Sequence, residues 1–229
     1  MNTSRKVAVW DIWVRLFHWS LVVLFTVAWF TGEEENDLHI WAGYAILGLL
    51  VFRVIWGFVG SRHARFGDFI RPPAEVVSYL KGLASGRVRH YLGHNPAGGW
   101  MILALLLSLS VVTFSGLKVY AIEEGKGPLA WTVSPSAETY PAAGYREEWE
   151  EDDEAMELEE AGEHEEAGME AGEDEEEEEF WEEIHEASVN FTLLLVFLHI
   201  AGVIVSSRLH RENLVRAMIT GYKEPPEGS

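Results

Sequence analysis

Long apolar runs occur four times along the chain, each about as long as a membrane-spanning helix. They cover residues 13–32, 38–60, 98–121 and 184–207. About 20 apolar residues are needed for a helix to cross the hydrocarbon core of a bilayer. The pattern therefore predicts an all-α integral membrane protein built as a four-helix bundle. The first run carries Arg15 and His18 and has no small-residue cleavage site after it, so we expect a retained helix rather than a signal peptide.

A polar segment of low complexity separates the third run from the fourth. Residues 121–183 hold 26 of the 37 acidic residues and two of the 17 basic ones, which leaves 11 acidic and 15 basic residues elsewhere. This charge density predicts a long acidic loop that is disordered or loosely helical. The chain thus divides into residues 1–121 with three membrane helices, an acidic insert at 122–180, and residues 181–229 with the fourth helix and a tail.

The distribution of basic residues predicts the orientation in the membrane. Lysine and arginine gather before and at the start of the first helix, in the 61–97 connection and in the tail after the fourth helix. The positive-inside rule assigns these regions, and with them both termini, to the cytoplasm. The acidic 33–37 connection and the acidic insert are then periplasmic. Within 61–97, the stretch PPAEVVSYLKGL predicts an amphipathic helix at the membrane interface, with Val76, Val77 and Leu80 toward lipid.

Two histidines of the fourth run, His185 and His199, are fourteen residues apart. In a helix this spacing corresponds to about 21 Å along the axis and to positions within about 40° of one face. Ionisable side chains inside a membrane need partners. At matching depths, His39 of the second helix faces His185, and His18 of the first faces His199. Two imidazoles across a bundle are the axial ligand pair of a b-type haem, so we expect two haems b.

A haem-free role for the histidines fits the sequence less well. A zinc site is disfavoured because each depth offers two histidines and no thiolate or further ligand. The chain has no cysteine, which excludes the covalent attachment of c-type haem. A haem-free helical membrane protein, such as a small transporter or an assembly subunit, would account for the helices but not for the matched histidines. Haem ligation is not expected of four other histidines, His63, His90, His94 and His210. His164, which lies in the acidic insert, fits weak adventitious metal binding.

Three further residues fit a haem site, although a simpler role is open for each. Gly43 lies one helical turn from His39, and Gly202 lies near His199. Glycine there either lets a flat macrocycle approach the backbone or serves ordinary helix packing. Arg53, fourteen residues after His39, either pairs with a haem propionate or extends toward the membrane interface.

Several motifs resemble those of the bacterial four-helix di-haem cytochromes b, which include the cytochrome b subunits of nickel–iron hydrogenases. They are WDIWVRLFHW, LHIWAGYAILGLLVFRVIWGFVG, YLGHNPAGGWMILALLL, SGL and IHEASVNFTLLLVFLHIAGV, and the resemblance covers residues 7–121 and 181–222. It implies that His18, His39, His185 and His199 ligate two haems b. It also implies an electron relay between membrane quinone and a redox partner. The chain would then be an electron-transfer subunit of an oxidoreductase in the bacterial inner membrane, and nucleic acid is not an expected partner.

The acidic insert departs from the short loop of that family. Three roles are open for it: electrostatic docking of a basic partner such as a soluble cytochrome c, capture of divalent cations by clustered carboxylates, or a solvated spacer. The expected periplasmic partner is a redox protein such as a cytochrome c or a hydrogenase.

Overall fold

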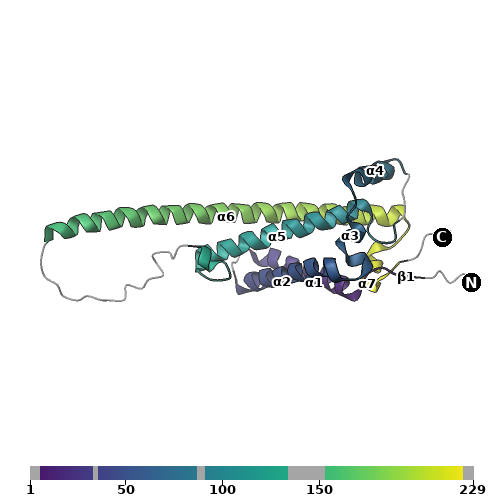
Figure 1. Ribbon diagram of the computed structural model, residues 1–229, viewed down its shortest axis with the longest axis horizontal. Coiled ribbons are helices and arrows are strands. Elements are labelled where there is room, and N and C mark those ends of the chain that lie inside the picture. Colours follow the sequence, from purple (N-terminus) through teal and green to yellow (C-terminus); the bar gives the residue numbers. More distant parts are fainter. Residues whose placement is uncertain (1–5, 33–35, 87–90, 134–152, 224–229) are drawn as a thin grey trace, which may run out of the picture. The chain divides into compact units, whose positions relative to one another are not determined.

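The computed structural model describes residues 6–32, 36–86, 91–133 and 153–223, with only the backbone described for 153–174 (Figure 1). In these ranges four helical segments are long and apolar enough to cross a membrane. They are α1 (Ile12–Thr31), α2 (Asp37–Val59), α5 (Pro96–Glu124) and the Glu175–Leu209 part of α6 (Asp153–Leu209). The four predicted membrane helices and the all-α class are thus confirmed.

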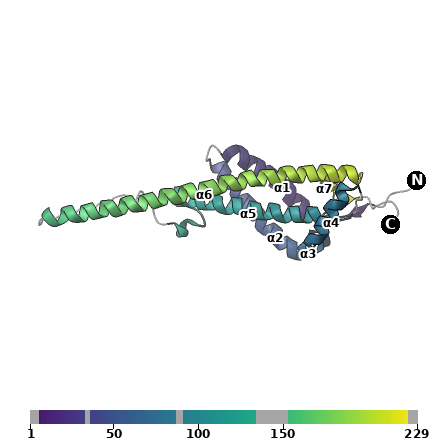
Figure 2. The same cartoon turned by 90° about the horizontal axis from the view of Figure 1, so that it is seen from above.

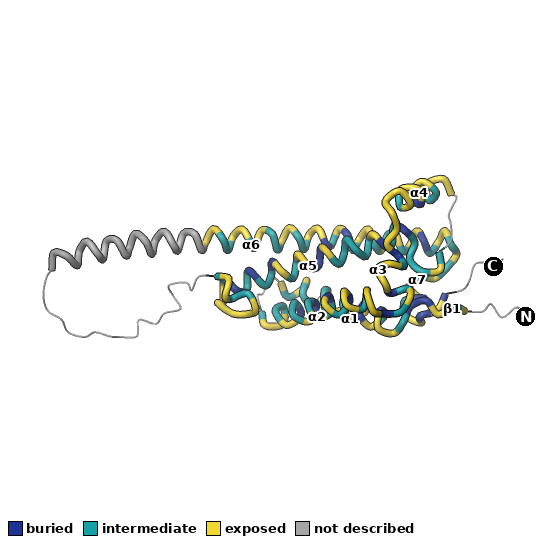
Figure 3. Tube along the Cα trace, in the orientation of Figure 1, coloured by how far each residue is buried: buried dark blue, intermediate teal, exposed yellow. Residues whose placement is uncertain are grey.

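The chain forms two compact units. One comprises Met1–Thr113 with Ser188–Ser229, and the other comprises Phe114–Ala187. Helices α1 and α2 pack side by side in the first unit (Figure 1). Its core holds Ile46 and Leu50 of α2 against Leu109 of α5. Many other apolar side chains of the spans are exposed, as expected for helices that face lipid (Figure 3).

Short elements connect α2 to α5 within the first unit. They are η2 (Arg62–Ala64), α3 (Phe66–Phe69) and α4 (Pro73–Ala84). Helix α4 covers nearly the same residues as the predicted amphipathic helix. Of its predicted lipid-facing residues, Val77 and Leu80 are exposed and Val76 is half-buried, while Tyr79 is buried. Proline at its start suits the first helical turn, where a backbone N–H has no intrahelical partner.

The two ends of the described chain are joined by a feature that we did not predict. Helix α7 (Leu214–Thr220; Figure 2) is followed by Gly221. The φ of Gly221, 88°, is in the left-handed region that favours glycine. Strand β1 (Val7–Ala8) then pairs antiparallel with β2 (Tyr222–Lys223). The carbonyl of Gly221 also accepts hydrogen bonds from the backbone nitrogens of Val9 and Trp10, at 2.9 and 3.1 Å.

The second unit contains the end of α5, η3 (Ala130–Thr132) and the first part of α6, up to Ala187. Lys118 of α5 donates to Glu177 of α6 at 3.1 Å and lies over the ring of Trp181 at 5.6 Å. Helix α6 begins at Asp153, inside the acidic insert. The insert was expected to be disordered or loosely helical, and from Asp153 onward it is helical. Residues 134–152 lie outside the described residues.

Candidate functional site

The structure brings His18 of α1 and His199 of α6 together within the first unit. Their ring centroids are 6.5 Å apart, and the ring planes are inclined by 51°. Both side chains are partly buried. The Nδ1 atom of His18 is fully buried and has no hydrogen-bond partner among the described residues. A buried polar atom without a partner is costly, so this arrangement suggests a group that the protein chain alone does not supply.

The spacing of these two rings fits a shared metal. Two imidazoles that bind one metal ion from opposite sides, through bonds of about 2 Å, would have ring centres roughly 6 Å apart. The observed 6.5 Å is close to that value. Iron with two axial histidines is the arrangement of a low-spin b-type haem.

His39 lies at the start of α2, where Asn36 caps the helix by accepting from the backbone nitrogens of Leu38 and His39. The Nδ1 atom of His39 is 3.0 Å from the carbonyl oxygen of Ala28 in α1. A carbonyl can only accept, so this Nδ1 carries a proton and the lone pair of the neutral ring is on Nε2. That tautomer is the one that binds a metal through Nε2.

His185 lies in the second unit, in contact with α5. Its Nδ1 is 3.1 Å from the hydroxyl of Ser115, which is fully buried. A Cβ at the adjacent Gly116 would lie 2.9 Å from the ring, so glycine leaves the space that His185 occupies. Because His39 and His185 belong to different units, the structure describes each in its own surroundings and not as a pair.

Arg53 and the two glycines also lie in the first unit. Arg53 is 3% exposed, and its guanidinium carbon lies 5.3 and 5.9 Å from the ring centres of Phe66 and Phe69. Its Nη1 is buried with no hydrogen-bond partner among the described residues. No described atom lies within 4 Å of a Cβ added to Gly43 or Gly202, so close helix packing does not require glycine at either position.

His94 occupies a more enclosed place than the sequence suggested. Its ring contacts Trp10 and Phe69, with centroids 4.3 and 4.9 Å away, and its Nδ1 is buried without a partner among the described residues. Burial, reinforced by the nearby charge of Arg53, lowers the pKa of His94 to about 3. His94 is therefore a neutral ring at neutral pH. His94 lies in the motif YLGHNPAGGW, but the neighbours of its ring come from distant parts of the chain, so its enclosure could not be predicted locally.

The remaining histidines and the clustered carboxylates lie outside the membrane-spanning helices or near their ends. His63 pairs with Asp68 at 2.9 Å, while His90 and the side chain of His164 lie outside the described residues. Carboxylate oxygens of Glu123, Glu178 and Glu182 lie within 4.8 Å of one another, but such exposed acidic groups are common without an ion. This cluster does not decide between the roles open for the insert.

Four membrane-spanning helices, two of which bring histidine rings together, define a helical membrane protein of the cytochrome b class. The chain belongs to the prokaryotic cytochrome b561 family, whose model matches residues 9–221. Membership implies haem b and a role in membrane electron transport. It also argues against the haem-free alternative.

Relatives with assigned names support this family. The chain is 27% identical to the probable Ni/Fe-hydrogenase B-type cytochrome subunit of Rhizobium leguminosarum bv. viciae, over 57% of this chain and 65% of that protein. It is 28% identical to the protein of the same name from Azotobacter vinelandii, over the same shares. It is 22% identical to that of Cupriavidus necator, over 97% of this chain and 88% of that protein. The chain thus spans 65% of the length of the first two relatives, and no solved structure matches it.

Proposed function

We propose that this chain is a di-haem cytochrome b that relays electrons across the bacterial cytoplasmic membrane, between the quinone pool and a periplasmic redox partner. Bound haem b supplies the one-electron redox chemistry. His18 with His199 would hold one haem, and His39 with His185 would hold the other. Histidine ligation from both sides would leave no open position for a substrate. The chain is then an electron-transfer subunit rather than a stand-alone enzyme.

The observation that carries this proposal is the pair formed by His18 and His199. The two rings come from helices at opposite ends of the sequence, and their centroids are 6.5 Å apart. The fourteen-residue spacing between His185 and His199 then provides a second ligand on α6, about 21 Å along the helix.

Hydrogen bonds at His39 and His185 support the second ligand pair. Each ring has its Nδ1 beside an oxygen, the Ala28 carbonyl at 3.0 Å and the Ser115 hydroxyl at 3.1 Å. Such contacts fix the orientation of a ligand ring and increase the basicity of its metal-binding nitrogen. Ser115 is therefore a positioning residue for His185.

Arg53 and Gly43 complete the proposed sites. The buried guanidinium of Arg53 has an Nη1 with no partner among the described residues, and a haem propionate is an anion that would satisfy it. The aromatic rings of Phe66 and Phe69 hold the charge in place through cation–π contacts. At Gly43 the open space beside the backbone is compatible with the approach of a flat macrocycle.

The sequence and the names of the relatives support the proposed ends of the relay. The relatives are named as hydrogenase subunits, which favours a hydrogenase as partner, whereas the acidic insert favours a basic protein such as a soluble cytochrome c. In the orientation we propose, both termini are cytoplasmic and the insert is periplasmic. Quinone is the membrane-soluble substrate that suits the other end.

Redox titration of single histidine variants, followed by the visible absorption of reduced haem, tests the ligand pairing. His18→Ala and His199→Ala should remove the same spectral component, and His39→Ala and His185→Ala should remove the other. His164→Ala, in the insert, is the matched control and should retain both. Loss of different components in His18→Ala and His199→Ala would show that the pairing is wrong.

A further inference from the structure

A groove lies where helix α2 ends and η2 begins. It has a volume of about 380 Å³ and is lined by Gly57, Phe58, Arg62, Arg65, Phe66 and Asp68. Residues Gly57 and Phe58 belong to the last turn of the α2 span, so the groove lies at the depth where a membrane helix leaves the hydrocarbon core. Arg62, Arg65 and Phe58 are exposed, and the groove is open to the surroundings.

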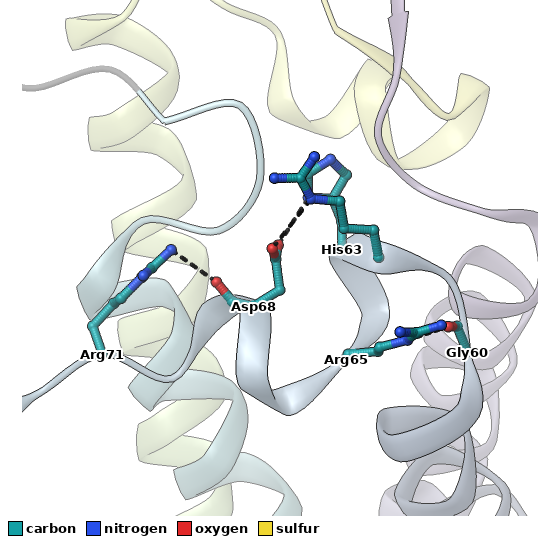
Figure 4. Close-up of polar contacts among 6 residues, drawn as sticks. Gly60, His63, Arg65, Asp68 and Arg71 are labelled. Atoms are coloured by element: carbon teal, nitrogen blue, oxygen red, sulfur yellow. Dashed lines mark hydrogen bonds and ion pairs between the residues drawn. The ribbon is translucent and has the colours of Figure 1, made fainter.

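Two contacts shape the groove, one between Gly57 and Phe66 and the other between Arg65 and Gly60. Gly57 has no side chain, and a Cβ there would overlap the ring of Phe66, so the glycine allows this ring to form the floor. Arg65 donates from Nε to the carbonyl oxygen of Gly60 at 2.7 Å (Figure 4). This bond fixes the orientation of the Arg65 side chain, and the residue is exposed.

The polar lining is positive. It has two guanidinium groups, Arg62 and Arg65, and one carboxylate, Asp68. That carboxylate is engaged by His63 at 2.9 Å, and it lies 3.6 Å from Nε of Arg62 (Figure 4). The Arg62 side chain is nevertheless 84% exposed. An anion entering the groove would therefore meet two guanidinium groups, which are suited to phosphate oxygens.

An apolar strip continues from the groove along the outside of α2. Phe58 is 70% exposed, Val59 66% and Ile55 56%, within a segment long and apolar enough to span the membrane. A soluble anion would gain nothing from this strip. An acyl chain would cover it while its headgroup occupied the groove.

We propose that the groove binds an anionic phospholipid. The phosphate lies between Arg62 and Arg65, and one acyl chain runs along Phe58 and Ile55. Basic pockets at the ends of membrane helices recognise lipid headgroups through this combination of charge and depth. The site contains none of the proposed haem ligands, although Phe66 of its lining also contacts Arg53.

Native mass spectrometry of the purified, haem-loaded full chain in detergent tests this site. The probes are phosphatidylglycerol, phosphatidylcholine with the same acyl chains, and inorganic phosphate as competitor. Phosphatidylglycerol should bind in preference to phosphatidylcholine, and the double variant Arg62→Gln with Arg65→Gln should weaken it about tenfold. Arg208→Gln with Arg216→Gln changes the net charge equally, away from the groove, and should retain wild-type affinity.

Three results would overturn the proposal. They are equal affinity for the two lipids, an equal loss in the Arg208 and Arg216 control, and full displacement of the lipid by inorganic phosphate, which would indicate a free-phosphate site. Haem absorption reports whether the double variant is folded. If the double variant is not folded, the single variant Arg62→Gln decides the test, because the Arg62 side chain is exposed and is not needed for folding. Unchanged phosphatidylglycerol affinity in the single variant would contradict the site.

Discussion

Ser115 of α5 contacts a proposed haem ligand, His185, through a hydrogen bond. The serine is fully buried, and its hydroxyl lies 3.1 Å from Nδ1 of the histidine ring. If His185 binds iron through Nε2, its Nδ1–H donates to Ser115 and the ring becomes a stronger electron donor. That effect favours ferric over ferrous iron and lowers the midpoint potential of the haem.

Replacing Ser115 with alanine should therefore raise one midpoint potential. A hydrogen bond worth about 1 kcal/mol corresponds to roughly 40 mV for a one-electron couple. Redox titration in detergent would show the shift in the component that His185→Ala removes. Ser110→Ala on the same helix, whose hydroxyl donates to the Leu106 carbonyl, is the control and should leave both potentials unchanged. An unshifted potential in Ser115→Ala would remove Ser115 from the site.

The four histidines could be selected as candidate ligands from the sequence, because helical spacing predicts matching depths for them. The structure brings one of the two predicted pairs together, His18 with His199. By contrast, the contacts of Ser115 and His94 could not be predicted, although both residues lie in motifs that carry the family resemblance. Serine is common in membrane helices, and the surroundings of His94 depend on Trp10 and Phe69 folding onto it from distant positions.

Helix α1 is held at its start by Asp11. One carboxylate oxygen caps the helix by accepting from the backbone nitrogen of Val14 at 2.9 Å. The other accepts from the indole nitrogen of Trp56 at 3.3 Å and from the hydroxyl of Ser61. Burial raises the pKa of Asp11, but these hydrogen bonds outweigh it and hold that pKa below its ordinary value. One carboxylate thus links the start of α1 to the end of α2.

Asp11→Ala should destabilise the protein. Loss of the cap costs about 1 kcal/mol, and the donors left on Trp56 and Ser61 add roughly 1–3 kcal/mol. Thermal unfolding in detergent should show a lower Tm. Asp11→Asn, which retains an oxygen acceptor, should lie between Asp11→Ala and the wild type. An alanine variant that unfolds at the wild-type temperature would show that Asp11 does not stabilise this junction.

The acidic insert offers a test at the scale of a segment. Deleting residues 140–174 removes much of the negative charge but spares Glu177, which pairs with Lys118. Both haems should remain bound, because no proposed ligand lies in that range. Stopped-flow oxidation by a basic cytochrome c should slow at low salt, and the difference should fade as salt screens charges beyond about 8–10 Å.

A neutral glycine–serine segment of equal length in place of 140–174 is the matched control for charge. It should slow the reaction as much as the deletion does, and reduction by quinol should be unchanged in both variants. If neither variant alters the rate at low salt, the insert does not dock a basic partner and the spacer role remains. Haem loss in either would mean that the segment supports the bundle.

The apolar runs were sufficient to predict the four spans, because their length is set by bilayer thickness. The same reasoning could not predict where α6 begins. Acidic composition opposes helix formation by charge repulsion, yet the helix continues back to Asp153. The pairing of β1 with β2 was also missed, since two-residue strands at opposite ends of the chain leave no periodic pattern.

At the scale of the whole molecule, the protein separates a large apolar surface from its excess charge. In the most apolar 18-residue stretch of each helix, only 11% of the residues of α1 and 28% of those of α2 are buried by the chain itself. An apolar surface of this extent requires lipid or partner helices to cover it. The net charge of −20, in contrast, comes from the insert, because the rest of the chain has an excess of basic residues.

The number of haems per chain tests the central claim most directly. The two ligand pairs that we propose, at two depths of the membrane, would require two non-covalent haems b. Purified protein should yield two haems per polypeptide by the pyridine haemochrome assay against quantitative amino-acid analysis, and acid acetone should extract both. A reproducible value of one, in protein with all four histidines intact, would contradict the two-site account.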